Sequence, residues 1–394
     1  MKTMSAESMN PDQNDKTDHD LGSNRRDFLI AGLILVFCVG LFFLDLAPAP
    51  FKEKGSKEKA LVLETDDSDL STIGLVRQGS QHLKVKILSG KQKGEIFSAD
   101  NLLRAQMDLD KIFKPGDLVL VALYEGAEPE TATLNAQDHY RLEWTVSLFA
   151  LFALLLLVFG GWTGFKALLS FVFTCLVIWK LMVPLCLKGV DPVLLATIIV
   201  ALLSAVIIFL VAGLNRKGIT AFFGAFAGVV VSCLLAWIFT AVFRLNGAVM
   251  PYSQALLYSG YESLDLSSIY IGGIFLSSSG AVMDLGMDIS AGMSEVVRQT
   301  GSISRRDLIW SGIRMGRSVV GTMTTTLLLA YSGGYLTLMM MFAAQGTSPV
   351  DFLNNPYVAS EIVKTIIGSF GLVLVAPLTA LIGGFLLLRN SIEK

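Results

Sequence analysis

Seven long apolar segments follow one another between Trp144 and Leu388, and an eighth lies near the N-terminus. A helix needs about 20 apolar residues to cross roughly 30 Å of hydrocarbon, and each segment is long enough. Only 16% of the 394 residues are charged, whereas soluble domains carry about a quarter. The predicted spans are residues 25–47, 144–163, 166–187, 192–213, 218–243, 266–290, 311–343 and 361–388. We therefore predict a polytopic α-helical membrane protein with about eight transmembrane helices, surrounded by the lipid bilayer.

Residues 1–24 are polar, with four aspartates among Ser, Asn and Gln. A segment of this composition cannot bury a core, so we predict a disordered cytoplasmic tail. Arg25 and Arg26 then precede an apolar run that is longer than the core of a usual signal peptide. The Ala-Pro-Ala-Pro that follows is a poor cleavage site, so we favour an uncleaved anchor over residues 25–47, with cleavage as the alternative.

Residues 50–142 have the composition of a soluble β-rich domain. Short runs rich in Val, Ile and Leu are separated by turn signals such as SGKQKG and KPGD. The predicted strands are LVLET, TIGLVRQ, HLKVKIL, GEIFS and DLVLVAL. Five short strands in about ninety residues indicate a small β-barrel or sandwich, with an OB-like barrel as the favoured form. The loops have no aromatic cluster to stack bases, so we expect no nucleic-acid binding.

The distribution of Lys and Arg between short loops predicts the orientation, because cytoplasmic loops carry the excess. An N-terminus in the cytoplasm places most of these residues inside: Arg25, Arg26, Lys166, Arg216, Lys217, Arg298, Arg305, Arg306, Arg389 and Lys394. Apart from the basic residues of the β-rich domain, only Lys188 and Arg244 then lie in extracytoplasmic loops. This arrangement makes both termini cytoplasmic and residues 50–142 extracytoplasmic.

The predicted span 266–290 and the turn after it carry three carboxylates, Asp284, Asp288 and Glu295. Steps of three and four residues place these acids and Ser277 on one helix face. A central Asp costs about 2.5–3.5 kcal/mol to insert into a bilayer, so this stripe should face the helix bundle or a water-filled cavity. Asp284 is the deepest of the three acids and is the main candidate for a functional residue.

Candidate cations lie on other spans. Arg314 and Arg317 begin the span after the acidic one, and an antiparallel pair of helices would bring them level with Asp288 and Glu295. Lys180, late in another span, is a further buried cation or an outward-reaching one. Two alternatives remain: Glu295 and Arg317 lie at the headgroup level, or Asp288 and Arg314 form a purely structural ion pair.

Other features carry less information. Glu262 and Asp265, in a tyrosine-rich outer stretch, suggest a vestibule to a pathway, and Glu361 and Lys364 are spaced as a local pair. Pro184 and Pro377 should kink their helices, and Ser332-Gly333-Gly334 should break a segment that is too long for one span. All three histidines lie outside the spans and no Cys-x-x-Cys occurs, so no metal site and no cofactor are expected.

The stretch GAVMDLGMDISAGMSEV resembles the signature of the YibE/F family of bacterial multipass membrane proteins. The segments VKILSGKQKGEIFSADNLL and KPGDLVLV resemble the external part of the same family, and the resemblance covers about residues 60–390. It implies a multipass protein of the bacterial cell membrane with this domain layout. Asp284 matches the Asp of the family pattern, and the resemblance implies no catalytic residue.

Three functions compete on this sequence. Intramembrane carboxylates near cations favour a secondary transporter or ion-coupled permease for a small solute, with a proton or cation as the coupling ion. The alternative is a membrane sensor or scaffold whose β-rich domain binds a partner. An intramembrane aspartyl protease is disfavoured, because Asp284 and Asp288 share one helix and Gly-x-Gly-Asp is absent. The sequence carries no signal for the oligomeric state.

Overall fold

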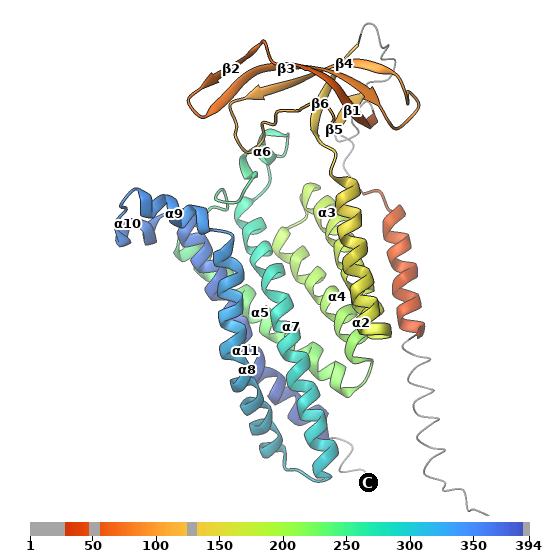
Figure 1. Ribbon diagram of the computed structural model, residues 1–394. Helices are drawn as coiled ribbons and strands as arrows, with labels where there is room; N and C mark the ends of the chain where they lie inside the picture. Colours follow the sequence, from red (N-terminus) through yellow and green to blue (C-terminus); the bar gives the residue numbers. More distant parts are fainter. Residues whose placement is uncertain (1–27, 47–55, 124–131, 389–394) are drawn as a thin grey trace, which may run out of the picture. The chain divides into compact units, whose positions relative to one another are not determined.

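The computed structural model describes residues 28–46, 56–123 and 132–388, so the predicted tail 1–24 lies outside the described residues (Figure 1). The chain forms two compact units, described separately below. One comprises Ala49–Val158, and the other comprises Met1–Pro48 together with Phe159–Lys394. We call them the β-unit and the helical unit.

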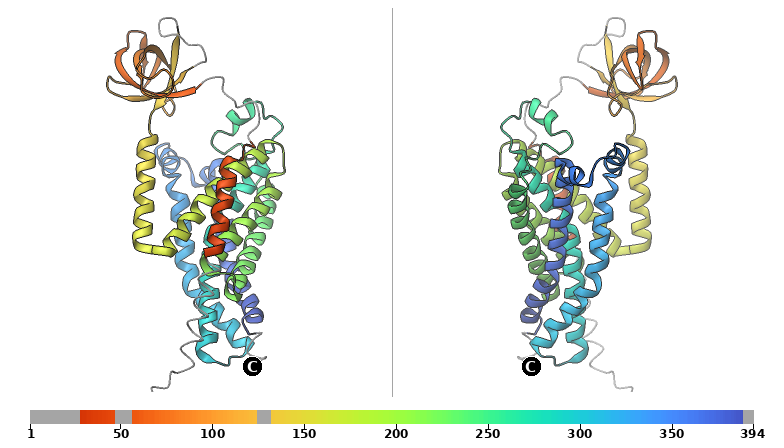
Figure 2. Two further views of the ribbon diagram at one scale, coloured as in Figure 1. Left: turned by 90° about the vertical axis from the view of Figure 1, so that its right-hand side faces the viewer. Right: turned by 90° about the vertical axis from the view of Figure 1, so that its left-hand side faces the viewer.

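The β-unit is built on one sheet of six strands. Its strands are β1 (Ser56–Asp66), β2 (Leu70–Ile73), β3 (Val76–Ile87), β4 (Ile96–Arg104), β5 (Leu118–Leu123) and β6 (Thr133–His139). The order β1-β5-β6-β4-β3 closes into a barrel because β1 also pairs with β3, while β2 only extends β3 as a hairpin (Figure 2). All pairs are antiparallel except β4 with β6. A five-stranded barrel of this kind agrees with the predicted OB-like form.

Alternation along the strands fills the barrel. On β3, Leu83, Val85 and Ile87 are buried while Lys84 and Lys86 are exposed, as a period of two requires. The predicted strand TIGLVRQ is wrong, because the chain reverses there at a two-residue hairpin in which Gly74 has a φ of 64°. The sixth strand, β6, was not predicted, because its sequence TLNAQDH is mostly polar.

His82 on β3 lies between two carboxylates, and this makes the stability of the β-unit depend on pH. Its Nδ1 is 2.7 Å from Asp100 and its Nε2 is 3.0 Å from Asp69. The hydrogen bond to Asp69 and then that to Asp100 raise the pKa of His82 above its ordinary value. The stabilisation is therefore fully present below a pH of about 6.5 and is lost as the pH rises through the raised pKa.

We expect His82→Gln to remove this pH dependence. Hydrogen exchange of β3 and β4 in the full-length protein, measured at several pH values, should show wild-type protection exceeding that of His82→Gln at low pH. The two proteins should converge at high pH. A difference that stays constant over the whole pH range would contradict the assignment.

The helical unit contains most of the long helices. The helices of the described residues are Phe28–Phe43, α2 (Leu142–Val177, shared between the units), the π-helix η2 (Ile178–Met182), α3 (Val183–Leu187), α4 (Pro192–Ala212), α5 (Arg216–Val242), α6 (Ser253–Tyr258), α7 (Leu266–Thr300), α8 (Arg305–Gly333), α9 (Leu336–Ala344), α10 (Pro349–Asn354) and α11 (Pro356–Leu386). Five are long and apolar enough to cross a membrane, counting Leu142–Leu187 as one, and α8 with α9 makes a sixth if that pair is one span.

The observed helices can be compared with the eight predicted spans at three places. The predicted boundary between the spans 144–163 and 166–187 is close to the observed one, because α2 consists of two helices that meet at a kink at Gly161, where φ is 51° and ψ is −125°. Within the described residues, the predicted anchor 25–47 contains the apolar helix Phe28–Phe43. The predicted break at Ser332-Gly333-Gly334 is confirmed, because α8 ends at Gly333 and α9 is bent from it by 65°.

Helix α7 is the centre of the helical unit, because it packs against α4, α5, α8 and α11 (Figure 1). Small residues permit this close packing. A Cβ at Gly286 would lie 3.3 Å from the backbone oxygen of Ala221 on α5. A Cβ at Gly316 of α8 would lie 2.5 Å from that of Ala376 on α11. The core around α7 therefore has little room for larger side chains.

Candidate functional site

One face of the central helix α7 is exposed among the described residues of the helical unit. Its buried face includes Val282, Leu285, Ile289 and Met293, which join the main hydrophobic core. The exposed positions recur every three or four residues and are small or acidic: Gly273, Ser277, Gly280, Asp284, Asp288 and Ala291. We call these six residues the α7 stripe. The predicted grouping of Ser277, Asp284 and Asp288 on one face is confirmed, but this face points away from the bundle core because the apolar face fills it.

The carboxylates of the α7 stripe have no ion-pair partner within 4.0 Å among the described residues. The hydroxyl of Ser277 donates to the carbonyl of Ile274 at 3.0 Å, so it is satisfied within its own helix. Nothing lies within 4 Å of the position that a Cβ would take at Gly273 or Gly280. The stripe is therefore an open surface with two unpaired acids.

The turn between α4 and α5 provides a reference level for the positions of these acids along α7. The hydroxyl of Ser290 donates to the carbonyl of Lys217 at 2.6 Å, which puts the basic residues of this turn level with Ser290. Asp288 is within one helical turn of Ser290. Asp284 is about 9 Å from Ser290 along the axis of α7, at a rise of 1.5 Å per residue. Glu295 lies beyond the turn and pairs with Arg298 at 2.7 Å. Of the three acids on α7 and its last turns, Asp284 is thus the farthest from Ser290 and the α4–α5 turn on the side away from Glu295.

The arginines of α8 are level with the acids but point elsewhere. Positions 292 and 315 of the antiparallel pair α7–α8 face each other, since a Cβ at Gly292 would lie 2.6 Å from Met315 Sδ. Gly312 and Gly316 face the contact with α7 and α11. Arg314 is about half a helical turn away from Gly316 and is exposed, while Arg317 lines a groove between α8 and α11. Among the described residues, neither forms an ion pair with Asp288 or Glu295.

Lys180 lies in the π-helical segment η2, just before Pro184. The wider π turn is where this part of the chain departs from a regular helix, and Pro184 follows it in the first turn of α3. The Lys180 side chain is half-buried and has no ion-pair partner within the described part of the chain. The structure does not bring it to the arginines of α8.

The two outer acids have different surroundings. Glu262 is exposed in the turn before α7. Asp265 is the N-cap of α7, accepting hydrogen bonds from the Ser267 N–H at 2.9 Å and the Ser268 hydroxyl at 2.6 Å. The bond from Ser268 holds the pKa of Asp265 below its usual range. Helix capping thus explains Asp265 without a vestibule.

A second polar cluster forms where the α8–α9 bend meets α11. Glu361 and Lys364 form the predicted local pair, with 3.8 Å between charged atoms, and the Lys364 ammonium lies 5.2 Å from the centre of the Tyr331 ring. Glu361 also lines a cavity of about 300 Å³ together with Tyr331 and Tyr335. The bend brings these two tyrosines to Glu361. The sequence signal for this cluster was Tyr331 and Tyr335 flanking the Gly-Gly break.

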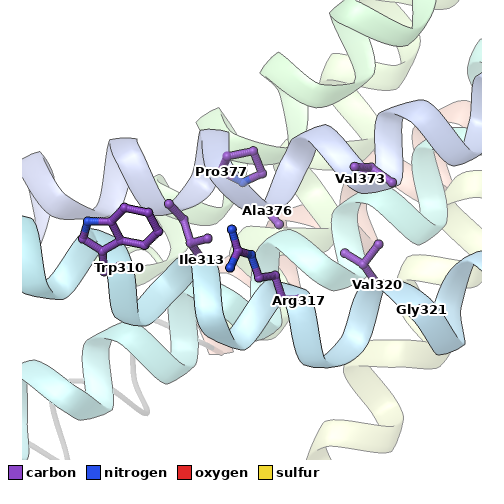
Figure 3. A pocket seen from close by; sticks show the side chains of 8 residues that line it. All are labelled: Trp310, Ile313, Arg317, Val320, Gly321, Val373, Ala376 and Pro377. Atoms are coloured by element: carbon purple, nitrogen blue, oxygen red, sulfur yellow. The ribbon is translucent and has the colours of Figure 1, made fainter.

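The groove that contains Arg317 is otherwise apolar. It has a volume of about 430 Å³ and lies between α8 and α11 (Figure 3). Its walls are Trp310, Ile313, Val320 and Gly321 of α8 with Val373, Ala376 and Pro377 of α11. The Arg317 side chain runs back toward Ile313, and its guanidinium lies between the two helices (Figure 3).

No group of three His, Cys, Asp or Glu side chains in the described ranges could hold a metal ion. A sequence model described as YibE/F-like protein matches residues 148–389, and one described as the YibE/F family N-terminal domain matches residues 57–138. No curated protein and no solved structure matches the chain. The two matched regions correspond to the helices and the barrel and together cover most of the sequence, and the apolar helices make the chain an integral membrane protein. The chain belongs to the YibE/F family.

Proposed function

We propose that this protein is a secondary transporter or ion-coupled permease for a small solute, with the α7 stripe as the path of the coupling ion. The single observation that carries the proposal is the uncovered polar face of the central helix. Protons or other cations are the coupling ions that carboxylates serve. The protein acts in the bacterial cell membrane, with cytoplasmic termini and an extracytoplasmic β-unit.

The energetics favour water over lipid at the α7 stripe. A central Asp facing lipid costs about 2.5–3.5 kcal/mol on insertion scales. Asp284, about 9 Å along α7 from the basic α4–α5 turn, has no ion pair within the described residues to offset such a cost. The exposed positions of α5 offer a comparison, because Leu234, Trp237 and Val242 are large and apolar there. A helix face that meets lipid carries such side chains, whereas the α7 stripe carries glycine, serine and aspartate. A water-filled path beside α7 gives both carboxylates the solvation that they require.

The bent pair α8–α9 supports the same proposal. Broken helices in transporters leave backbone carbonyls free to bind ions near a site. Here the 65° bend lies beside Glu361, a largely buried acid whose carboxylate is 3.8 Å from the Lys364 ammonium. Glu361 and Asp284 provide acids on two helices that pack together, α11 and α7. We assign the coupling role to Asp284 because it lies on the open stripe.

The second candidate function is a sensor or scaffold whose β-unit binds a partner. The observation that favours it is the independent core of the barrel, which includes Phe97, Phe113 and Val121. In that case the helical unit would anchor the β-unit in the membrane or transmit its signal, and the acids of the helical unit would be dispensable for function.

Flux through the purified protein tests the proposal. Proteoliposomes with a pH-sensitive dye inside, exposed to gradients of protons and a panel of cations, should show flux that protein-free liposomes lack. A variant without residues 56–140 should retain part of this flux if the helices form the path. Folded wild-type protein with no flux under any gradient would contradict transport and favour the partner-binding function.

A further inference from the structure

The groove between α8 and α11 combines a positive charge with an apolar channel. Its volume of about 430 Å³ lies within the range of about 300–1,000 Å³ that is common for ligand sites. Arg317 is its charged residue, and no acidic residue lines it. Nothing lies within 4 Å of the position that a Cβ would take at Gly321, so the channel is open beside that residue.

The depth of Arg317 places it near the membrane surface. Gly316, its neighbour, lies against Ile289 of α7, and the next α7 residue, Ser290, bonds to the carbonyl of Lys217. Arg317 is therefore level with the basic α4–α5 turn, where lipid phosphates meet a membrane protein. Its side chain runs back toward Ile313 and the half-exposed Trp310, away from the membrane centre (Figure 3). This direction is typical of an arginine that reaches for the headgroup layer.

We infer that this groove binds one anionic phospholipid from the leaflet at the α7–α8 turn. The lipid phosphate pairs with the Arg317 guanidinium, and one acyl chain lies along Val320, Gly321 and Val373. Charge complementarity identifies this occupant, because the nearby parts of α7 and α8 also carry Arg298, Arg305 and Arg306. Basic sites between helices near the membrane surface bind anionic headgroups in this way. The site is independent of the proposed transport activity.

Native mass spectrometry of the full-length protein in detergent tests the inference. Phosphatidylglycerol and phosphatidylcholine with the same acyl chains are added at equal concentration. Wild-type protein should retain one phosphatidylglycerol at least about tenfold more tightly than phosphatidylcholine, as a charge-assisted bond predicts. Arg317→Gln should lose that preference. Gly321→Leu should weaken the binding of both lipids, because the leucine side chain fills the channel.

Arg314→Gln is the matched control, because Arg314 is exposed on the same helix and does not line the groove. It should retain the preference for phosphatidylglycerol. An Arg317→Gln variant that keeps the preference would overturn the inference, as would an equal loss in Arg314→Gln, which would indicate diffuse surface charge. Complete displacement of phosphatidylglycerol by excess glycerol 3-phosphate would overturn the acyl-chain contact, because a free phosphate ester would then suffice.

Discussion

Replacing Asp284 by Asn should reduce ion flux in proteoliposomes to the level of protein-free liposomes while the protein stays folded. The carboxamide has nearly the same shape but can neither carry a negative charge nor release a proton at neutral pH. Asp284 has no ion pair within the described residues, so the substitution breaks no salt bridge. Flux is measured with a dye inside the liposomes, and folding is measured by thermal unfolding in detergent.

Asp307→Asn provides the control for that experiment. Asp307 lies exposed in the first turn of α8, where it accepts a hydrogen bond from the Ser304 hydroxyl at 2.6 Å. Its neutralisation changes the net charge by the same amount at a distance from the α7 stripe, so flux should persist. Wild-type flux in folded Asp284→Asn protein would remove Asp284 from the ion path.

Gly224→Leu should strongly destabilise the helical unit. Gly224 of α5 faces α11, and a Cβ there would overlap the Thr379 hydroxyl oxygen and lie 2.7 Å from the Thr379 Cβ. Neither backbone can yield, because α5 also packs closely against α7. Overpacking a close-packed core commonly costs about 1–3 kcal/mol, and a whole leucine against backbone should reach or exceed about 3 kcal/mol. Thermal unfolding and gel filtration in detergent measure the loss.

Gly280→Leu is the matched substitution on the α7 stripe. A Cβ at Gly280 meets nothing within 4 Å, so this variant should unfold at nearly the wild-type temperature. Equal destabilisation by the two substitutions would mean that the open face of α7 is covered in the folded protein. A stable Gly224→Leu variant would contradict the close approach of α5 and α11.

The sequence predicted the grouping of polar residues along α7 correctly, because helical spacing alone determines which residues share a face. It grouped Ser277, Asp284 and Asp288 and located the break after Ser332. It did not determine which neighbour each face would meet. The arginines are level with the acids, yet Gly312 and Gly316 occupy the α7 contact and turn Arg314 and Arg317 away.

Two other features depend on contacts between distant segments. Strand β6 is mostly polar, and in TLNAQDH only Leu134 and Ala136 alternate toward the core. This pattern is too short to identify a strand without the pairing with β4 and β5. The surroundings of Glu361 likewise arise from the 65° bend, which carries Tyr331 and Tyr335 to α11. Local spacing predicted only the pair with Lys364. Tertiary packing therefore determines these two features, and the periodicity of the sequence does not predict them.

Cysteine accessibility along α7 tests the central claim that its stripe faces water. The four native cysteines, Cys38, Cys175, Cys186 and Cys233, are replaced, and single cysteines are introduced into the protein in liposomes. A charged, membrane-impermeant thiol reagent should label cysteines at 277, 280, 284 and 288. It should not label a cysteine at position 282, which is buried, or at position 234, which is exposed on an apolar face. If positions 280 and 284 react as slowly as position 234, the stripe faces lipid or protein rather than water, and the ion path proposed here is wrong.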